Sequence, residues 1–494
     1  MSDLPLFSAA PSRRAAVGLG VAVAAAALLV GGLVGLASPL IALGALAALA
    51  VAVWALTNLE IGLWGAIGLI TLLPFAALPF KLVFTPTFLD LAVGGTFLVY
   101  LMQWMTGRRR RLALTPAHAP IFVFLALAVF SFVAGLPNGP LTPNLMRQFA
   151  ELLINIALCF VVVDYVDNWD KFSRLARVIL LGGTAAAVLG IGLYVIPAAT
   201  ANRLLSALSV FGYPGGDVLR YIEDNPANAQ RAIGTAVDPN FFGGVLATVG
   251  GLLAPQVLSR KPVLGSRWLS LGAFGIVVGA LVLTFSRGAM VGLAVGMILV
   301  VMLRYRRLLI VMAAGGLAIL ILPMTRDYVL HFLQGVQGQD LATQMRLGEY
   351  KDALILIQRY PLLGVGFAGA PEIDIYLGVS SAYLLIAEQM GLIGLAVFVI
   401  GMATVFIWSF SRRRLLYAAA ETAAGQGQLL LWLGAHAGLA AALVVGIVDH
   451  YFFELSFQPA GSLFWIFVGL CLAASRLAGG APAGESEQGL SIFH

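Results

Sequence analysis

A set of charged side chains stands close to the ends of long apolar segments, where an ionisable group is costly unless it has a function. The middles of these segments hold almost no ionisable groups, with His436 as the main exception. Coupled transporters usually keep their charged site near the midplane of the membrane. Charges at the segment ends are instead typical of an enzyme that acts on a lipid-linked substrate at the outer leaflet. The set comprises Asp90, Arg147, Glu151, Arg231, Asp238, Arg287, Glu388, His450 and Glu454.

Arg287 lies in the sequence LTFSRG (283–288), which predicts a tight turn between two short membrane spans. We expect Gly288 to give this turn its backbone freedom. An arginine held in such a re-entrant turn can bind an anion such as a diphosphate through paired hydrogen bonds. The alternative is an arginine that extends to the outer lipid headgroups.

Arg231 and Asp238 belong to a segment whose Asp-Pro-Asn sequence predicts a break near the outer end of a helix. The free amides at such a break can bind an anion, whereas the alternative is an Arg231–Asp238 ion pair that closes the loop. Arg346 and Glu349 lie three residues apart on a predicted helix, where an exposed pair of negligible energy is the alternative. His450 is either a functional group or an interfacial packing residue.

The elements that must position these groups are membrane helices. The chain has 494 residues, of which 60% are hydrophobic and 11% are charged. This composition excludes a soluble enzyme and a disordered protein, and the long apolar runs lack the alternation that a membrane barrel strand needs. We therefore predict an all-α polytopic membrane protein with about fourteen spans. The spans begin near Ala15, Pro39, Ile61, Phe88, Ala119, Phe149, Val178, Ala232, Trp268, Ala289, Leu308, Ala382, Leu429 and Ser462.

The basic residues predict the orientation of these spans. With the N-terminus in the cytoplasm, 19 of the 29 Lys and Arg residues fall on the inside, as orientation bias requires. Both termini are then cytoplasmic, and the net charge of +6 reports orientation, with no nucleic-acid partner. Cys159, Cys471 and the five scattered histidines predict no metal site.

Two long loops fall on the outer side, at residues 198–231 and 325–381, and loops of this length are often functional. In the second loop Leu347, Tyr350, Leu354 and Ile357 recur at helical spacing, although Leu356 falls off this stripe. This spacing predicts an amphipathic helix at the outer membrane interface. Three regions follow from this layout. They are an N-terminal transmembrane bundle with the first outer loop (1–230), a core with the arginine motifs and the large outer loop (231–400), and C-terminal helices with a short cytoplasmic tail (401–494).

Five motifs between residues 230 and 400 together resemble the O-antigen ligase and O-antigen polymerase superfamily. They occur in the family's order, and the first 220 residues match only in hydropathy. The first motif fits the family pattern R-x-x-G-T/F-x-x-x-P-N, and the last fits its Y-L-x-x-x-x-E-x-G-L-x-G-L with Gln389 at the Glu position. The motifs are RAIGTAVDPN (231–240), LTFSRG (283–288), MRL (345–347), YPLLGVG (360–366) and YLLIAEQMGLIGL (383–395).

The resemblance implies a glycosyltransferase of the GT-C type in the inner membrane, with its active site on the periplasmic side. Such enzymes transfer a glycan from an undecaprenyl diphosphate donor to an acceptor hydroxyl with inversion, and they need no metal or other cofactor. By motif, Arg231, Arg287 and Arg346 would stabilise the diphosphate leaving group. The partners implied are the lipid-linked donor, a glycan acceptor, membrane lipids and proteins of polysaccharide assembly. Further catalytic candidates are Asp238 and Glu388, and substrate-binding candidates are Arg147, Arg220, Asn240, Glu349, Tyr383 and His450.

One departure from the family concerns the base. Ligases of this family carry His-Asn just before the Tyr-Leu of the last motif, and that His is the proposed base, whereas Ser380 and Ser381 stand here. A serine hydroxyl is not a general base near pH 7. Either another group takes this role, or the chain is a polymerase-like member, which the fourteen spans also favour. The candidate groups are Glu388, Asp238, Glu349 and His450.

Two alternatives remain beside a polymerase. The first is a ligase that transfers the glycan to another lipid, peptide or protein acceptor. The second is a flippase or transporter of the glycolipid, which would move the substrate without changing its glycan length.

Overall fold

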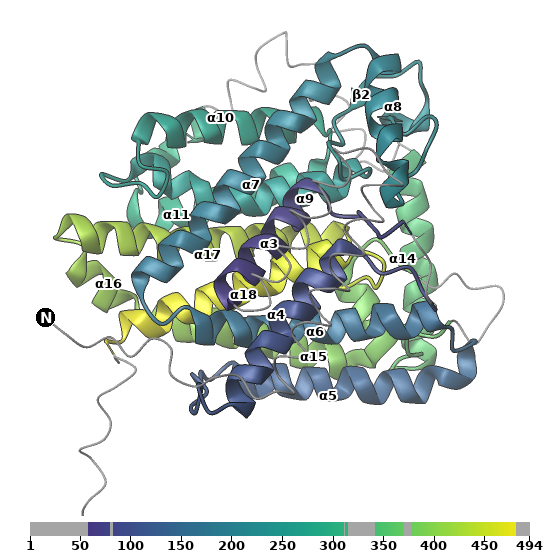
Figure 1. The fold of residues 1–494 in the computed structure, drawn as a ribbon, viewed down its shortest axis with the longest axis horizontal. Coiled ribbons are helices and arrows are strands. Elements are labelled where there is room, and N and C mark those ends of the chain that lie inside the picture. Colours follow the sequence, from purple (N-terminus) through teal and green to yellow (C-terminus); the bar gives the residue numbers. More distant parts are fainter. Residues whose placement is uncertain (1–57, 80–82, 311, 315–340, 370–377, 481–494) are drawn as a thin grey trace, which may run out of the picture.

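The structure is a computed structural model that describes residues 58–79, 83–310, 312–314, 341–369 and 378–480 (Figure 1). Within these residues, nine helices are long and apolar enough to cross a membrane, and two shorter apolar helices, α3 (Leu59–Leu72) and α10 (Arg267–Leu283), accompany them. The predicted all-α architecture is therefore confirmed for this part of the chain. The nine are α4 (Phe88–Met105), α5 (His118–Gly135) with η1 (Leu136–Asn138), α6 (Pro143–Tyr165), α7 (Trp169–Val195), α9 (Pro239–Leu253) with η4 (Ala254–Leu258), α11 (Arg287–Arg304), α15 (Ala382–Ser411) with α16 (Arg413–Ala419), α17 (Ala423–Val448) and α18 (Gln458–Ala478).

The predicted spans can be compared with these helices one by one. Eleven of the predicted spans correspond to helices of the structure. The span near Ile61 is α3, the span near Trp268 is α10, and the other nine are the nine long apolar helices. The spans near Ala15 and Pro39 lie outside the described residues, and the span near Leu308 lies mostly outside them. The total of fourteen spans thus stays a prediction.

The helix boundaries follow from capping residues more than from hydropathy. The span predicted to begin near Ala232 begins only at Pro239, because the Asp238 side chain accepts hydrogen bonds from the first free amides and Pro239 fits the first helical turn. Thr422 caps α17 in the same way by accepting from the Gly425 amide. Capping therefore moves these ends by several residues from the apolar runs.

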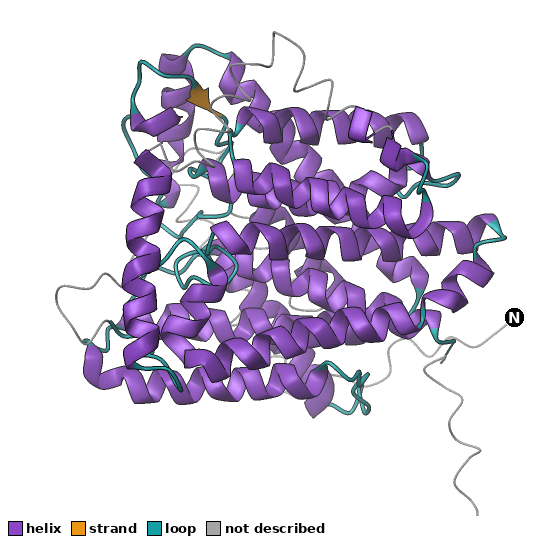
Figure 2. Ribbon diagram, turned by 180° about the vertical axis from the view of Figure 1, so that it is seen from behind, coloured by secondary structure: helices purple, strands orange, loops and turns teal. Residues whose placement is uncertain are grey.

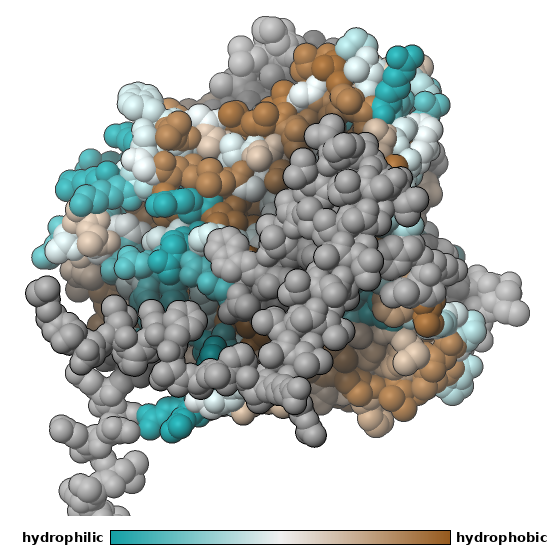
Figure 3. Space-filling view, in the orientation of Figure 1, coloured by the Kyte–Doolittle hydropathy of each residue, from teal (hydrophilic) through white to brown (hydrophobic). Residues whose placement is uncertain are grey.

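α17 lies between three other spans and packs against α9, α11 and α18. Small residues allow these close approaches, as is usual between helices in lipid. At Gly251 of α9 an added Cβ would lie 2.6 Å from the backbone nitrogen of Gly438 in α17. The apolar helices run side by side across Figure 1, and apolar residues cover much of the same face in Figure 3, between hydrophilic groups at its left and right edges. This distribution fits a bundle that crosses a membrane along the helix direction.

α14 (Leu341–Arg359) runs across the ends of the other helices instead of along them, as both Figure 1 and Figure 2 show. This direction fits the predicted interfacial helix. Two leucines of the predicted apolar stripe are exposed, Leu347 at 56% and Leu354 at 48%, whereas Leu356, which falls off that stripe, is fully buried. The face turned to the bundle carries Ala353, Leu356 and Ile357, which are all buried.

α15 is broken at Gly391, where φ is +70° and the helical pattern is interrupted. The loop 361–366 fills the break, since the Val365 amide donates to the Glu388 carbonyl at 2.8 Å and the Gly366 amide to the Gln389 carbonyl at 3.0 Å. Gly364 adopts φ +68°, and an added Cβ there would lie 2.5 Å from the Glu388 carbonyl oxygen. The PLLGVG motif and the glycine of the last motif therefore form one joint between the outer loop and a discontinuous helix.

The first outer loop folds as a small unit of its own. It contains α8 (Ala198–Ser206), η2 (Ala207–Phe211) and a two-stranded antiparallel ribbon of β1 (Arg220–Tyr221) and β2 (Gln230–Arg231), joined through η3 (Ile222–Asp224). Its own apolar cluster comprises Ala201, Leu205, Val218, Leu219 and Ile233. The ribbon ends at Arg231, so this unit positions that arginine a few residues before the start of α9.

Candidate functional site

Arg231 is held at the edge of the bundle by two neutral acceptors. Its Nε donates to the Thr284 carbonyl at 2.8 Å, and its Nη2 donates to Asn240 Oδ1 at 2.6 Å. Burial lowers the pKa of Arg231 from its usual value, while the charge of Asp238 acts in the opposite direction. The alternative of an Arg231–Asp238 ion pair is wrong, because these two described side chains form no salt bridge with each other. These two hydrogen bonds fix the direction of the Arg231 guanidinium, and neither acceptor is a carboxylate that would neutralise its positive charge.

Asp238 has a different set of contacts. Its Oδ1 accepts from the amides of Asn240 and Phe241, both at 2.8 Å, and from the hydroxyl of Tyr451 at 2.7 Å. The backbone amides of Asn240 and Phe241, which we expected to be free to bind an anion, therefore already donate to the Asp238 carboxylate. Val237, just before it, adopts φ +63°, which is strained for a β-branched residue.

The turn before Arg287 lies directly against Arg231. The Ala232 amide donates to the Leu283 carbonyl at 2.8 Å, and the next carbonyl along accepts from Arg231. Arg287 begins α11 and is half-buried. The residue with the left-handed backbone is Phe285, with φ +53°, so the expectation for Gly288 is corrected. Gly288 is helical and serves close packing, since an added Cβ would lie 2.5 Å from Val448 Cγ2.

α14 brings Arg346 to the same place. The charge of Arg346 acts on the pKa values of Arg231 and Asp449, so it lies near both groups. Arg346 is half-buried and makes no hydrogen bond or ion pair within the described ranges of the chain. The positive charges of Arg231 and Arg346 act against each other, and a bound anion would relieve that repulsion.

Glu349 lies one helical turn beyond Arg346. Its Oε2 accepts two hydrogen bonds from Ser380, one from the amide at 2.9 Å and one from the hydroxyl at 2.6 Å. The hydroxyl of Tyr350 donates to the Ser380 carbonyl at 3.1 Å. Adjacent residues of α14 therefore hold the segment just before α15.

The link between α17 and α18 carries three further ionisable residues, Asp449, His450 and Glu454. His450 Nε2 lies 3.2 Å from Glu454 Oε2, and Nδ1 lies 3.7 Å from Asp449 Oδ1. Burial alone would lower the pKa of His450, but the contact with Glu454 and the charge of Asp449 outweigh it and raise the pKa. Burial raises the pKa of Asp449 to about 7, against the charges of His450 and Arg346. The raised pKa of His450 favours its cationic form beside Glu454.

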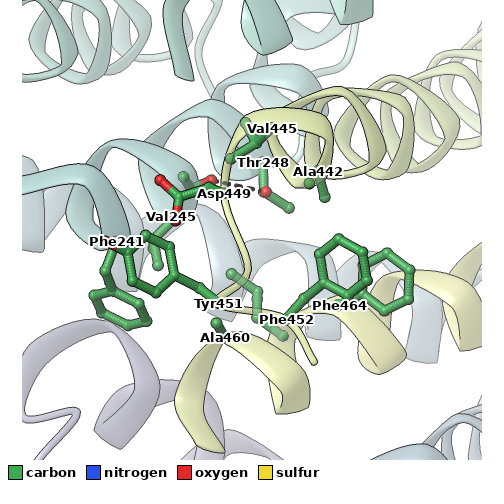
Figure 4. Close-up of a pocket in the computed structure, with 13 residues that line it drawn as sticks. Phe241, Val245, Thr248, Ala442, Val445, Asp449, Tyr451, Phe452, Ala460 and Phe464 are labelled. Carbon is green, nitrogen blue, oxygen red and sulfur yellow. Dashed lines mark hydrogen bonds between the residues drawn. The ribbon is translucent and has the colours of Figure 1, made fainter. Parts of the chain in front are cut away.

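A small apolar pocket opens beside Asp449 and Tyr451 (Figure 4). Its walls come from α9, α17, α18 and the link between the last two helices. Thr248 in this wall donates its hydroxyl to the Gly244 carbonyl at 2.8 Å, so little hydrogen-bonding capacity is left there. The lining is otherwise made of Phe241, Val245, Ala442, Val445, Gly446, Phe452, Ala460, Leu463 and Phe464. This pocket suits a hydrocarbon group next to the charged cluster.

Residues 272–399 match the family model described as O-antigen ligase. This match supports, for that segment, the resemblance to the O-antigen ligase and polymerase superfamily. No curated protein gives a significant match to the chain. At the level of the family, the match supports a membrane glycosyltransferase of the ligase or polymerase type with lipid-linked glycan substrates, and the nine apolar helices of the described residues suggest an integral membrane protein.

The matched O-antigen ligase segment contains only part of the charged cluster. Arg287, Arg346 and Glu349 lie inside residues 272–399, whereas Arg231 and His450 lie outside them. The charged cluster, which comprises Arg231, Arg287, Arg346, Glu349, Asp449 and His450, therefore combines residues inside and outside the matched segment. Arg231 joins it through its hydrogen bond to the Thr284 carbonyl. Asp449 and His450 belong to the link after α17. Among the described His, Cys, Asp and Glu residues, no group of three or more is arranged to hold a metal ion.

Four further candidates of the sequence have contacts of their own. Arg147 forms ion pairs with Asp90 at 3.0 Å and Glu151 at 2.5 Å, which use its charge within α4 and α6. Glu388 is 1% exposed and accepts from the Gly378 amide at 3.2 Å. The Tyr383 hydroxyl donates to the Leu443 carbonyl at 2.9 Å. These contacts position helices, and the predicted roles of these residues in catalysis or binding stay predictions.

The fourth candidate, Arg220, is exposed and lies directly across from Arg231 in the ribbon. Residues directly opposite in an antiparallel pair share one face, where like charges are unfavourable. An anion on that face would contact both arginines.

Sequence reasoning missed Asp449, Tyr451 and Thr284 as members of this candidate site. Asp449 follows the apolar run that forms α17 and directly precedes His450. Its signal was present, since a carboxylate between two apolar runs is costly. Thr284 acts through its backbone carbonyl, which no side-chain pattern reveals.

Proposed function

We propose that the protein polymerises glycans linked to undecaprenyl diphosphate, at the outer face of the inner membrane. The observation that carries this proposal is that Arg231, whose guanidinium donates to the Thr284 carbonyl and to Asn240, lies within electrostatic range of Arg346, while neither arginine forms a salt bridge with a described carboxylate. A diphosphate that leaves a sugar develops negative charge, and fixed guanidinium groups stabilise that charge most in the transition state. Arg287, at the start of α11 beside the Arg231 turn, completes the proposed clamp.

The proposed reaction is an inverting displacement that depends on arginines, in a GT-C-like membrane fold. The acceptor hydroxyl attacks the anomeric carbon from the side opposite the diphosphate. The apolar pocket beside Asp449 supports this picture, because a hydrocarbon chain attached to the diphosphate would have an apolar wall next to the charged groups. Arg220 would extend the cationic surface outward, toward the first sugars or the second phosphate.

A polymerase is favoured over a ligase because Ser380 stands where ligases of the family carry their histidine, and because the chain is predicted to have fourteen spans. The second candidate is a ligase to another acceptor, which is favoured by the match of residues 272–399 to the O-antigen ligase family. Both candidates use the same donor and differ only in the acceptor.

The experiment is a reconstitution of the purified protein in liposomes with a labelled oligosaccharide on undecaprenyl diphosphate. A ladder of longer glycans on the lipid supports the polymerase. Transfer to an added lipid, peptide or protein acceptor supports the ligase, and translocation with unchanged glycan length supports a flippase.

Arg231→Ala and Arg287→Ala are expected to abolish elongation while the protein remains inserted and folded. The matched control is Arg203→Ala, an exposed arginine of α8 on the same outer loop. Elongation by Arg287→Ala at the wild-type rate would show that the proposed clamp is wrong.

A further inference from the structure

The carboxylate of Glu349 is fixed on one side and open on the other. Both hydrogen bonds from Ser380 reach the same oxygen, Oε2. The other oxygen, Oε1, has no hydrogen bond in the part of the chain that is described, and the side chain is half-buried. A carboxylate held through one oxygen presents the lone pairs of the other in a fixed direction.

Two basic groups lie near this carboxylate. Arg346 precedes it by one turn of α14, and side chains at this spacing are neighbours on a helix surface. The charge of Glu349 also acts on His450, whose pKa is raised, so a cationic imidazole lies within electrostatic reach. Glu349 is therefore one helical turn from Arg346 of the proposed clamp and close enough to His450 for its charge to act on that group.

The other acids near this site are less able to accept a proton from an acceptor. Oδ1 of Asp238 accepts three hydrogen bonds and caps α9. Asp449 is 5% exposed and faces an apolar pocket, and Glu388 is 1% exposed inside the broken helix. His450 is held between two carboxylates, and a protonated imidazole cannot act as a base.

We infer that Glu349 is the general base that activates the acceptor hydroxyl, with Ser380 as its positioning residue. This inference rests on the proposed glycosyl transfer. The acceptor O–H bond breaks and its proton passes to Glu349 Oε1, while the acceptor oxygen forms a bond to the anomeric carbon. The bond from that carbon to the diphosphate oxygen breaks, and its electron pair leaves with the diphosphate beside the arginines. Water then takes the proton from Glu349.

The three-residue spacing of Arg346 and Glu349 on α14 is compatible with their proposed roles in binding the leaving group and in accepting the proton. Cβ atoms three residues apart on a helix are about 5–6 Å from each other, and the long arginine side chain can reach farther. Inverting transfer needs the base and the leaving group on opposite faces of the sugar ring, which separates them by several ångströms. One helix can therefore carry both a base and part of the leaving-group clamp.

The test compares Glu349→Gln with the wild type in the liposome assay. The glutamine keeps an oxygen for the Ser380 donors and loses the basic charge. We expect kcat to fall by about 10²–10⁴-fold, as for loss of a general base, with the KM for the lipid-linked donor unchanged. Glu223→Gln, the same change at an exposed outer-loop residue without a described contact, is the matched control and should retain wild-type kcat.

Two further variants separate catalysis from a structural role. Glu349→Ala should regain activity when formate is added, because a small carboxylate can occupy the vacated space, and loss of folding alone would not respond to formate. Ser380→Ala removes the hydroxyl donor but keeps the amide donor, so its kcat should fall by only about fivefold, the equivalent of one hydrogen bond.

The inference is overturned if Glu349→Gln turns over at the wild-type rate, or if formate leaves Glu349→Ala inactive. Failure of the proposed function looks different, since the wild type itself would then produce no longer glycan and transfer none to an acceptor.

Discussion

Replacement of Arg346 by alanine separates catalysis from stability more cleanly than any other change in the site. Within the described residues its guanidinium makes no hydrogen bond or ion pair, and its charge acts against that of Arg231. Its removal leaves no described partner unsatisfied and relieves one repulsion. We therefore expect the unfolding temperature of Arg346→Ala in detergent to match that of the wild type.

The expected loss of activity is large. One fixed donor to a developing oxyanion is worth about 2.7–4 kcal/mol in the transition state, which corresponds to a fall in kcat of about 100- to 1000-fold. Arg346→Lys keeps the charge but loses the planar fork, so its rate should lie between those of Arg346→Ala and the wild type.

The assay is single-turnover release of the lipid diphosphate from a labelled donor at saturating acceptor. Arg203→Ala, which removes an exposed arginine of α8, should turn over as the wild type does. The reasoning is refuted if Arg346→Ala keeps the wild-type rate, or if its activity and its unfolding temperature fall together.

Two predictions concern the framework of the site. Gly364→Ala should lower the free energy of unfolding by about 2–5 kcal/mol, from the left-handed backbone and the contact with α15, and an unchanged thermal transition would contradict this. Burial raises the pKa of Asp449 from 3.8 to about 7. Because the folded protein then binds this proton more tightly than the unfolded chain does, the wild type should lose stability as pH rises from about 4 to about 7. Asp449→Asn should lack this loss in a pH series of thermal unfolding, and parallel curves for the two proteins would exclude the assignment.

Hydropathy predicts the spans because each must present about 20 apolar residues to lipid, which is a local property of the sequence. It does not predict the break at Gly391, because the carbonyls freed there are satisfied by loop 361–366, more than twenty residues earlier in the chain. The same holds for α14. Its helical spacing was visible, but the face turned to the bundle depends on which side chains meet α15.

The arginines of the site were predictable because an arginine at a membrane edge is costly and therefore informative. Their partners were not, since Arg231 is held by a carbonyl 53 residues away and Asp238 by a hydroxyl 213 residues away. Arg147 shows the converse case. Its type and place resemble those of Arg231, and only the packing of α4 against α6 reveals that Asp90 and Glu151 take up its charge.

The joint between loop 361–366 and the broken helix also has a consequence for biosynthesis. The ribosome makes the loop before it makes the Glu388 and Gln389 carbonyls that the loop must meet. The Tyr451 hydroxyl that contacts Asp238 emerges later still, after α17. A nascent chain therefore carries its arginines into the membrane well before their surroundings exist, and the site is completed only when the last two helices are inserted.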